Sequence, residues 1–251
     1  MPSDILLETR ALTKAFKGFL AVNGVHLEVR RGTIHALIGP NGAGKTTVFN
    51  LLTKFLQPTS GTILYKGEDI THAQPADVAR KGIVRSFQIS STFPHMSVLE
   101  NVRVALQRKL GTSFQFWRSA RSLATLDDRA RELLDSVELR DYAQLRAVEL
   151  PYGRKRALEL ATTLATEPEL MLLDEPTQGM AHEDVGRVTQ LIRKVAANRT
   201  VLMVEHNLSV VEDLCDRITV LQRGAVLAEG TYAEVSSNPQ VLEAYVGVEH
   251  V

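Results

Sequence analysis

Apolar and polar positions alternate along the first thirty residues of the chain. Apolar side chains occupy Leu6, Leu12, Val22, Val25, Leu27 and Val29. Glycines at positions 18 and 24 interrupt the alternation. A period of two is typical of half-buried strands, and glycines between such runs mark turns. The pattern predicts short antiparallel strands at the start of the chain.

A different pattern follows. Residues 34–38 form a short apolar run that ends in a glycine-rich loop, and residues 45–56 then show helical spacing. This order predicts a strand, a loop and a helix. Residues 61–70 predict a second hairpin, and residues 83–87 predict another short strand.

The middle of the chain, residues 94–163, has mainly helical spacing and predicts an inserted helical lobe. Beyond it, apolar runs at 170–173 and 201–204 are separated by a helical pattern over 184–197. This alternation is that of a βαβ unit, so we expect an α/β protein with a parallel sheet. Residues 241–245 predict a short terminal helix.

Composition narrows the classes of protein that fit this pattern. The chain has 251 residues, of which 44% are hydrophobic, enough to bury a substantial core. Lysine plus arginine and aspartate plus glutamate each total 29, so no net field attracts an acidic bilayer or nucleic acid. No nucleic-acid partner is therefore expected, and any attachment to a membrane is expected to use a specific docking surface.

Two sequence features bear on the location of the protein, and a third bears on disulfide bonding. No apolar stretch approaches the roughly 18 residues of a membrane-spanning helix. Residues 1–5 lack a basic segment followed by a long apolar one, so we expect no secretion signal and a cytoplasmic location. The lone Cys215 has no second cysteine for an internal disulfide, and we expect it to be a small buried hydrophobe.

The most specific chemical signal lies between the predicted strand at 34–38 and the predicted helix at 45–56. The loop matches the phosphate-binding pattern of a glycine, four free positions and then Gly-Lys-Ser/Thr. Its residues are Gly39, Pro40, Asn41, Gly42, Ala43, Gly44, Lys45 and Thr46.

The composition of this loop suits a bound triphosphate. Small residues let backbone N–H groups surround the phosphates, and the following helix points its positive end at them. Lys45 is expected to stabilise charge on the terminal phosphates, Thr46 to give Mg²⁺ an oxygen ligand, and Thr47 to adjoin the nucleotide. A chance glycine turn is the alternative, and the flanking strand and helix argue against it.

A phosphate loop is shared by GTPases, kinases and ATPases, so it does not by itself define the reaction. The run at 170–173 ends in Asp174 and Glu175, as expected where a buried strand delivers carboxylates to a metal-bound phosphate. Asp174 is predicted to hold Mg²⁺ through its water shell, and Glu175 to polarise the attacking water as the catalytic base. An acidic turn is the alternative, but the phosphate loop makes it a minority view.

With two further peptides, these motifs resemble the ATPases of ATP-binding cassette (ABC) transporters, over essentially the whole chain. Residues 84–88 are similar to that family's glutamine loop, and residues 204–206 to its switch histidine. The resemblance implies that Gln88 contacts the metal or the attacking water and that His206 contacts the γ-phosphate. It also implies an aromatic ring stacked on adenine, for which Phe16 has the matching place and Phe19 is a nearby rival.

The same resemblance implies the fold in more detail. It is an α/β P-loop NTPase with a RecA-like core, an N-terminal antiparallel β subdomain and an inserted helical subdomain. Residues 1–251 then form a single ABC ATPase domain, with the core and β subdomain at about 1–89 and 164–251 and the helical subdomain at about 90–163. ATP and Mg²⁺ are the implied cofactors.

The signature peptide departs from the family's pattern. Its commonest form, Leu-Ser-Gly-Gly-Gln, corresponds here to Leu150, Pro151, Tyr152, Gly153 and Arg154. In the family this loop closes over ATP held by the other subunit of a head-to-tail dimer, so these five residues are candidate nucleotide contacts. Pro151 has neither a hydroxyl nor an N–H, whereas Gly153 keeps its amide and Arg154 adds a cation. The helix expected to begin near Lys155 still points its positive end at the phosphate, so we expect a weakened rather than an abolished site.

The dimer-contact loop, residues 176–181, departs as well. It has Ala181 where the family often carries Asp or Asn. The change either alters communication between the two ATP sites or reflects ordinary family drift. Pro151 and Ala181 together keep open an alternative function, a regulatory subunit without meaningful hydrolysis.

Several peptides are more similar to the ATPases of branched-chain amino acid importers, among them residues 98–102, 205–207 and 243–247. ATPases of urea or aromatic acid and amide import and of lipopolysaccharide export are alternatives. A soluble ABC ATPase is another, although it would usually bring a coiled-coil insertion or a second cassette. The aromatic-containing stretch at 110–127 fits the amino acid type better.

The implied partners are transmembrane permease subunits, a second ABC ATPase subunit in a homodimer or heterodimer and, indirectly, a periplasmic substrate-binding protein. The chain would work at the cytoplasmic face of a bacterial inner or plasma membrane. ATP would close the two ATPase subunits and hydrolysis would reopen them. Residues 93–101 would pass this motion to the permease. The cargo leaves no signal in this subunit, which never touches it.

Overall fold

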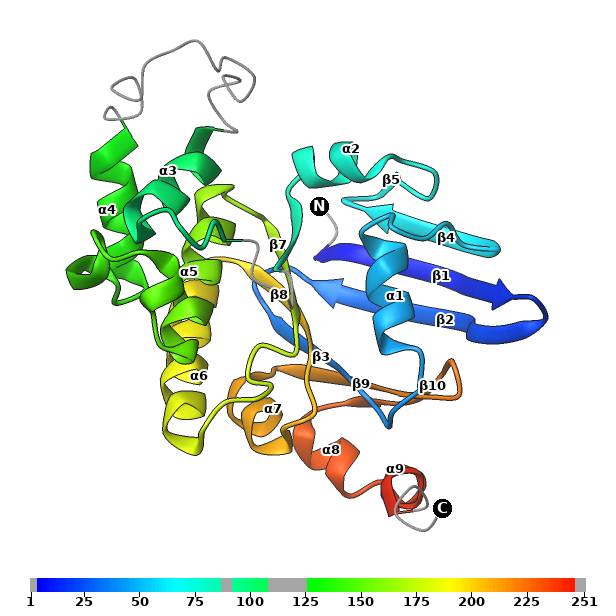
Figure 1. The fold of residues 1–251 in the computed structure, drawn as a ribbon. Helices are drawn as coiled ribbons and strands as arrows, with labels where there is room; N and C mark the ends of the chain where they lie inside the picture. Colours follow the sequence, from blue (N-terminus) through cyan, green and yellow to red (C-terminus); the bar gives the residue numbers. More distant parts are fainter. Residues whose placement is uncertain (1–3, 87–91, 108–125, 247–251) are drawn as a thin grey trace.

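The computed structural model describes residues 4–86, 92–107 and 126–246, which form two sheets and a set of helices (Figure 1). In chain order the elements are β1 (Ile5–Phe16), β2 (Phe19–Arg30), β3 (Ile34–Ile38), α1 (Lys45–Leu52), β4 (Ser60–Tyr65), β5 (Glu68–Asp69), α2 (Pro75–Arg80), β6 (Ile83–Ser86), α3 (Val98–Gln107), α4 (Asp127–Ser136), two 3₁₀ turns (Arg140–Tyr142 and Ala147–Glu149), α5 (Tyr152–Ala165), β7 (Leu170–Asp174), α6 (His182–Ala196), β8 (Thr200–Val204), α7 (Leu208–Leu214), β9 (Arg217–Gln222), β10 (Ala225–Gly230), α8 (Tyr232–Ser236) and α9 (Pro239–Val246).

The central sheet has six strands in the order β10-β9-β3-β8-β7-β6. Strands β9, β3, β8, β7 and β6 are parallel to their neighbours, and β10 pairs antiparallel with β9. Parallel strands require crossover connections, which the helices between them supply. The predicted α/β class with a parallel sheet is confirmed.

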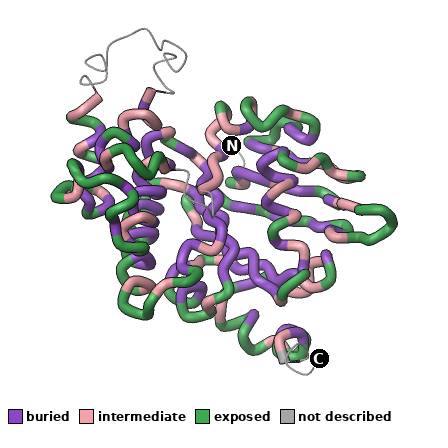
Figure 2. Tube along the Cα trace, viewed as in Figure 1, coloured by how far each residue is buried: buried purple, intermediate pink, exposed green. Residues whose placement is uncertain are grey.

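Both faces of this sheet are covered, which explains why its strands are continuous apolar runs. In β7, Met171 and Leu173 belong to the core shared with the helices α3 to α6. Leu170 and Leu172 point the other way, into a core shared with α1 and the N-terminal strands. Figure 2 shows the sheet as a band of buried residues between exposed outer segments.

The second sheet has the order β2-β1-β4-β5, with antiparallel pairing throughout, and confirms the antiparallel prediction. Strands β1 and β2 contain 12 residues each and are longer than the short strands expected. The reason lies at Gly24, which has φ 62° and lies within β2 between two paired positions, where the register shifts. A bulge bends a strand without ending it, so this glycine is not a break.

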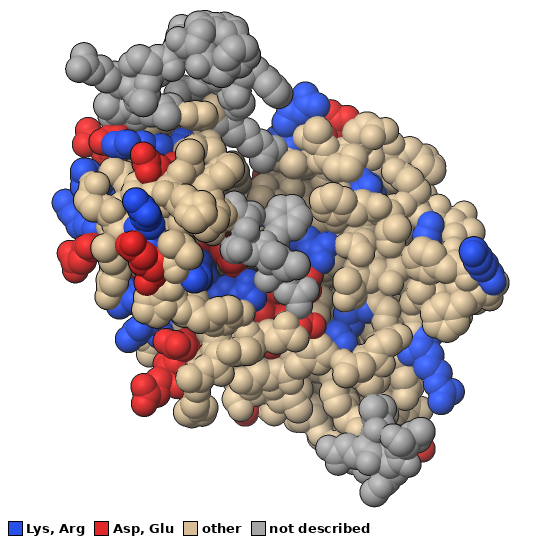
Figure 3. All heavy atoms as spheres, viewed as in Figure 1, with Lys and Arg blue, Asp and Glu red and all other residues tan. Residues whose placement is uncertain are grey.

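Helices α3, α4 and α5 pack on one another beside the central sheet (Figure 1). They confirm the helical character of the middle of the chain, and the subdomain boundaries near 90 and 163 stay predictions. On the face in Figure 3, acidic and basic side chains intermingle over this helical region, while the side of the antiparallel sheet carries fewer charges.

Two helix boundaries differ from the sequence prediction. Helix α1 ends at Leu52 rather than 56, because Lys54 turns the chain with a left-handed φ of 65°. Helix α5 begins at Tyr152 rather than near Lys155, with Pro151 as its N-cap residue at φ −56°. Gly153 and Arg154 therefore belong to its first turn, since proline is pre-organised for a helix start. Helices α2 and α8 and strands β9 and β10 were not predicted.

Candidate functional site

The candidate residues meet at one edge of the central sheet. Strands β3, β8 and β7 are neighbours and parallel, so their carboxyl ends lie side by side. The phosphate loop follows β3, His206 follows β8, Asp174 ends β7, and Glu175 comes directly after it. Ligands of open α/β sheets bind outside the carboxyl ends of the strands. Gln88, the candidate that follows β6, lies outside the described residues.

The loop between β3 and α1 is shaped by its glycines. Gly39 and Gly44 have φ values of 147° and 102°, which side chains rarely adopt. A Cβ at Gly39 would lie 2.1 Å from the carbonyl oxygen of Leu221, and one at Gly44 would lie 2.4 Å from that of Ala21. No side chain fits at either position. The loop thus keeps the bare backbone that an anion-binding cradle needs ahead of a helix N-terminus.

Lys45 opens α1 and is buried beneath this loop. Its Nζ atom donates hydrogen bonds to the carbonyl oxygens of Gly39, at 2.7 Å, and Pro40, at 3.0 Å. Burial lowers the pKa of the Lys45 ammonium, and the nearby Glu175 carboxylate acts in the opposite direction. The loop therefore holds a partly desolvated cation, which interacts strongly with an anion placed beside it.

A cavity of about 410 Å³ opens in front of the loop. Its lining comes from four parts of the chain and, apart from Ala21, consists of residues named from the sequence: Phe16, Phe19, Ala21, Asn41, Gly42, Ala43, Gly44, Lys45, Thr46, Thr47, Glu175 and His206. Both candidate aromatic rings line it, and both are largely exposed, at 41% for Phe16 and 68% for Phe19. The choice of Phe16 for adenine stays a prediction, with Phe19 beside it.

Glu175 and His206 face each other at the sheet edge. The His206 Nε2 atom lies 3.0 Å from Oε1 of Glu175. Glu175 has a left-handed φ of 46°, unusual for a residue with a side chain. Backbone strain of this kind persists where the surroundings fix it, and it clusters at functional sites. Two residues predicted to act on the same phosphate are thus in direct contact.

Asp174, the residue before Glu175, is buried. Its carboxylate forms an ion pair with the guanidinium of Arg85, which extends from β6. Arg85 lies within the glutamine-loop peptide and was not among the site residues predicted from the sequence. The signal that could have identified it is a basic residue at the carboxyl end of the strand beside β7.

Glu205 is a second site residue to which sequence analysis gave no role. Its buried carboxylate accepts hydrogen bonds from the backbone N–H groups of Thr177, His206 and Asn207, at 3.0, 2.7 and 3.1 Å. The Thr177 hydroxyl donates a further one. Glu205 thereby fixes the segment of His206 to the loop that follows Glu175. The only sign of this role in the sequence is the position of Glu205, an acid directly after the apolar run at 201–204.

The signature peptide lies at the start of α5. Leu150 and Gly153 are buried, whereas Pro151 and Tyr152 are exposed. The Tyr152 hydroxyl donates to the carbonyl oxygen of Gln178 at 3.2 Å, so this peptide contacts the dimer-contact loop of its own chain.

The charge of Arg154, which the sequence suggested as an added cation for nucleotide, is directed elsewhere. Its Nη1 atom donates to the carbonyl oxygen of Glu138 at 2.6 Å, and its guanidinium lies 4.7 Å from the centroid of the Tyr142 ring. Both contacts are made within the helical region.

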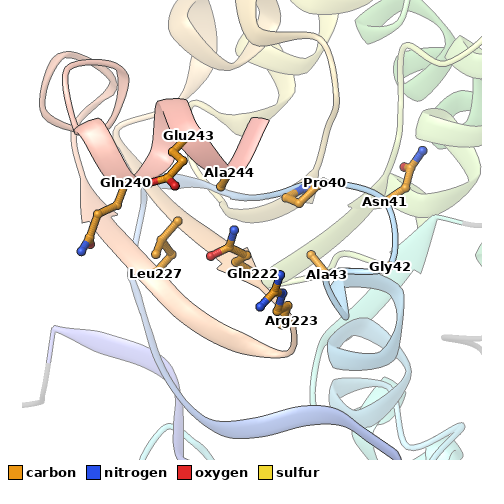
Figure 4. A pocket seen from close by; sticks show the side chains of 10 residues that line it. All are labelled: Pro40, Asn41, Gly42, Ala43, Gln222, Arg223, Leu227, Gln240, Glu243 and Ala244. Carbon is orange, nitrogen blue, oxygen red and sulfur yellow. The ribbon is translucent and has the colours of Figure 1, made fainter. Parts of the chain in front are cut away.

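A second cavity, of about 550 Å³, lies on the other flank of the loop (Figure 4). The turn between β9 and β10 and helix α9 enclose it from two sides, and its lining consists of Pro40, Asn41, Gly42, Ala43, Gln222, Arg223, Leu227, Gln240, Glu243 and Ala244. Nearby on α9, burial raises the pKa of Tyr245 to about 12, and a hydrogen bond from the Gly39 backbone opposes the shift. Helix α9 thus contacts the phosphate loop at Gly39, on the flank of this second cavity.

Comparison with known proteins agrees with this geometry. The profile of the ABC transporter family matches residues 22–178, and that of the branched-chain amino acid ATP-binding cassette transporter matches residues 225–251. The first match spans more than half of the chain and includes the phosphate loop and the acid pair. The protein belongs to the ABC transporter family and is an ATPase cassette of that family.

Individual relatives are similar over nearly their whole length. The high-affinity branched-chain amino acid transport ATP-binding protein BraF of Pseudomonas aeruginosa is 42% identical, covering 96% of this chain and 98% of the relative. The protein of the same description called LivG, from Escherichia coli, is 40% identical over 98% of this chain and 99% of its own length.

Solved structures agree on the fold. The ADP conformation of MJ1267, an ATP-binding cassette of an ABC transporter, superposes with a TM-score of 0.85 at 29% identity and covers 98% of this chain and 100% of its own. A nucleotide-free ATP-binding cassette from an ABC transporter gives a TM-score of 0.83, also at 29% identity, over 96% and 98%. The predicted ABC ATPase fold is therefore confirmed.

The four hydrogen bonds at Glu205 predict a measurable loss of stability in the Glu205→Gln variant. A carboxylate only accepts, whereas an amide places N–H groups against some of the same donors. We expect the free energy of unfolding to fall by roughly 1–3 kcal/mol, the cost of leaving buried donors unsatisfied. Urea denaturation measures it. The control is Glu212→Gln, which removes the same charge from an exposed position; equal stability of the two variants would contradict the assignment.

Proposed function

We propose that this protein is the ATP-binding and ATP-hydrolysing subunit of an importer of branched-chain amino acids. The observation that carries the proposal is the meeting of the phosphate loop, the acid pair and His206 at one sheet edge of an ABC family member. Relatives whose names include branched-chain amino acid transport are similar over nearly the full chain, which supports the same cargo here.

The phosphates of ATP would occupy the cradle between β3 and α1. Backbone N–H groups of the loop and the N-terminus of α1 favour negative charge there. Lys45, now held by two loop carbonyls, carries the cation nearest to this cradle. Thr46 and Thr47 line the same cavity as the aromatic rings of Phe16 and Phe19. We assign the adenine base to that aromatic end, where a ring face stacks on any base.

Mg²⁺ fits the donor set at this edge. Thr46 offers a hydroxyl at the start of α1, and Asp174 offers a carboxylate at the end of β7, both hard oxygen donors of the kind that Mg²⁺ prefers. We propose these two residues as its holders, Asp174 through water, together with Gln88. Bound there, the ion would supply positive charge that balances the terminal phosphates.

Hydrolysis requires a base that takes a proton from the attacking water. Glu175 directly follows β7 and lines the cavity, and its side chain is 13% exposed, so it reaches water without being freely solvated. His206, in contact with it, is placed to orient the carboxylate and to approach the terminal phosphate. Lys45 would stabilise the charge that develops on the phosphate as it is transferred.

This assignment predicts the behaviour of the Glu175→Gln variant. The amide keeps the size of the side chain but is no longer a base, so we expect ATP turnover to fall by roughly 10²- to 10⁴-fold, the usual contribution of a general base. The affinity for ATP should be retained, because Glu175 is not part of the cradle. Phosphate release and equilibrium nucleotide titration measure the two. Wild-type turnover would refute the assignment, with Glu212→Gln as the control for loss of an acid.

We further propose that two such subunits close head to tail over ATP, with the start of α5 facing the partner's phosphates. The end of α5 that carries Leu150 to Arg154 presents its helix N-terminus, which favours an anion. Pro151 offers no donor to an external phosphate, and the guanidinium of Arg154 is directed to Glu138 and the Tyr142 ring of its own chain. This supports a weakened contribution of the signature peptide to the partner's ATP site.

The Pro151→Ser variant tests that weakness. Serine restores a hydroxyl and an N–H, and a hydrogen bond to a charged group contributes about 1.5–3 kcal/mol. We therefore expect ATP turnover in the presence of permease subunits to rise by roughly tenfold. The matched control is Pro151→Ala, which restores the N–H without the hydroxyl. An unchanged rate in Pro151→Ser would count against the proposal.

An apolar surface on the helical region supports docking to a permease. The segment before α3 and the segment before α5 are joined by backbone hydrogen bonds, from Val148 to Pro94 at 2.9 Å and from Val98 to Leu145 at 2.9 Å. Their exposed side chains form what we call the apolar patch: Phe93, Met96, Leu145 and Val148, exposed by 51, 39, 43 and 49%. Patches of this kind mark interaction sites.

No helix among the described residues is long and apolar enough to cross a membrane. We propose that attachment at a bacterial inner or plasma membrane runs through the apolar patch and the permease subunits that it would contact. A periplasmic binding protein would act on the other side of that permease and would not touch this chain.

A charged residue introduced into the apolar patch should weaken binding to permease subunits without affecting ATP binding. We expect Val148→Asp to retain nucleotide binding and to co-purify with permease subunits at least roughly tenfold less, because burying an unpaired carboxylate at an interface is costly. Leu242→Asp on α9 is the matched control, since Leu242 is exposed to a similar extent, 53%. Equal recovery of both variants with the permease would exclude the patch as the docking surface.

A further inference from the structure

The carboxylate proposed to hold Mg²⁺ already has a cation of its own. Asp174 is 3% exposed, and the Arg85 side chain that pairs with it is 11% exposed. The Nη2 atom of Arg85 donates to Oδ2 of Asp174. The pair is therefore almost completely removed from water, where the attraction between its charges is strong.

Arg85 is also held from a second side. Its Nη1 atom donates to Oδ1 of Asn50 at 2.6 Å, and its guanidinium lies 5.7 Å from the centroid of the Phe49 ring. Asn50 lies on α1 one helical turn after Thr46, the other proposed ligand of Mg²⁺. Arg85 thus bridges the helix and the strand that would hold the metal.

A buried carboxylate needs a compensating positive charge, because desolvation disfavours the charged form strongly. Arg85 supplies that charge from within the chain. A metal ion approaching Asp174 meets a carboxylate whose charge is already neutralised, and it also meets the repulsion of the guanidinium. Only an added anion, such as the phosphates of a nucleotide, tips the balance toward a divalent cation.

We propose that Arg85 is a positioning residue that holds Asp174 against free divalent cations, so that the metal enters the site with the nucleotide and not before it. The proposal rests on the proposed function, in which Asp174 helps to hold Mg²⁺. It assigns to Arg85 a role in metal selectivity that is separate from turnover. Loss of the positive charge should convert the Asp174 region into a site that binds Mg²⁺ alone.

The test uses Mg²⁺ without nucleotide and compares wild type with Arg85→Gln and Arg85→Lys. Glutamine keeps hydrogen-bonding ability without charge, and lysine keeps the charge without the fork. Thermal melting is followed with MgCl₂ and with NaCl at matched ionic strength. For Arg85→Gln we expect a saturable, Mg²⁺-specific rise in the melting temperature of about 2–4 °C. Its half-maximal Mg²⁺ concentration should lie roughly tenfold or more below that of any response in wild type or Arg85→Lys.

Asn50→Ala provides a second route should Arg85→Gln fail to fold, because it keeps the charge and removes one of its two anchors. Its response to Mg²⁺ should exceed that of wild type and be smaller than that of Arg85→Gln. A wild-type response in every variant that folds would overturn the proposal.

The same melting experiment on wild type with ADP, with and without Mg²⁺, separates this inference from the proposed function. A rise that requires both Mg²⁺ and ADP supports the nucleotide site. Its absence would overturn that site together with the role of Arg85. A wild-type rise with Mg²⁺ and ADP, combined with no response of Arg85→Gln to Mg²⁺ alone, would overturn only the role of Arg85.

Discussion

The structure depends on a parallel sheet that is buried on both faces. Because β3, β7 and β8 have apolar side chains on both sides, they can only lie between two layers, and their carboxyl ends then open at one edge. That edge collects the glycine-rich loop together with the acid pair and His206, which follow the loop in the sequence by about 130 to 170 positions. The chemistry of the site follows from where the strands end.

At this edge the loops are tied to each other by charged groups with several partners each. Glu205 joins the segment of His206 to Thr177, and Arg85 joins Asp174 to Asn50. Tyr152 links the start of α5 to the loop after Glu175. A change at one loop is therefore felt by the others, because buried polar groups that lose a partner are costly. The contact of Tyr152 with Gln178 thus joins the site edge directly to the helical region that carries the apolar patch.

Much of the fold could be predicted from the sequence, and the features that could not be predicted depend on contacts between distant segments. Local spacing predicted β3, α1, β7 and β8, because a glycine-rich loop between an apolar run and a helical pattern has few other solutions. The alternation of the first residues predicted antiparallel strands but not the bulge at Gly24, which depends on pairing with β1. The start of α5 was placed three residues too late, since Pro151 reads as a break until its role as N-cap is seen.

The site residues also divide into those that a local motif identifies and those whose role depends on distant partners. Gly39 to Thr46, Glu175 and His206 were identified because each belongs to a motif with its own chemistry, and Asn41 to Thr46, Glu175 and His206 line one cavity in the structure. Arg85 and Glu205 were missed as site residues because their importance comes from partners distant in sequence. Arg154 was expected to add a cation for nucleotide, but its partners Glu138 and Tyr142 are set by the packing of the helical region.

The most direct test of this account is an equilibrium titration of the purified protein with a non-hydrolysable ATP analogue in the presence of Mg²⁺, compared with its Lys45→Ala variant. We expect saturable binding to the wild-type protein and a loss of most of that affinity in the variant, because Lys45 carries the cation beside the phosphate cradle. Absence of binding to the wild type, or equal affinity of the two proteins, would contradict it.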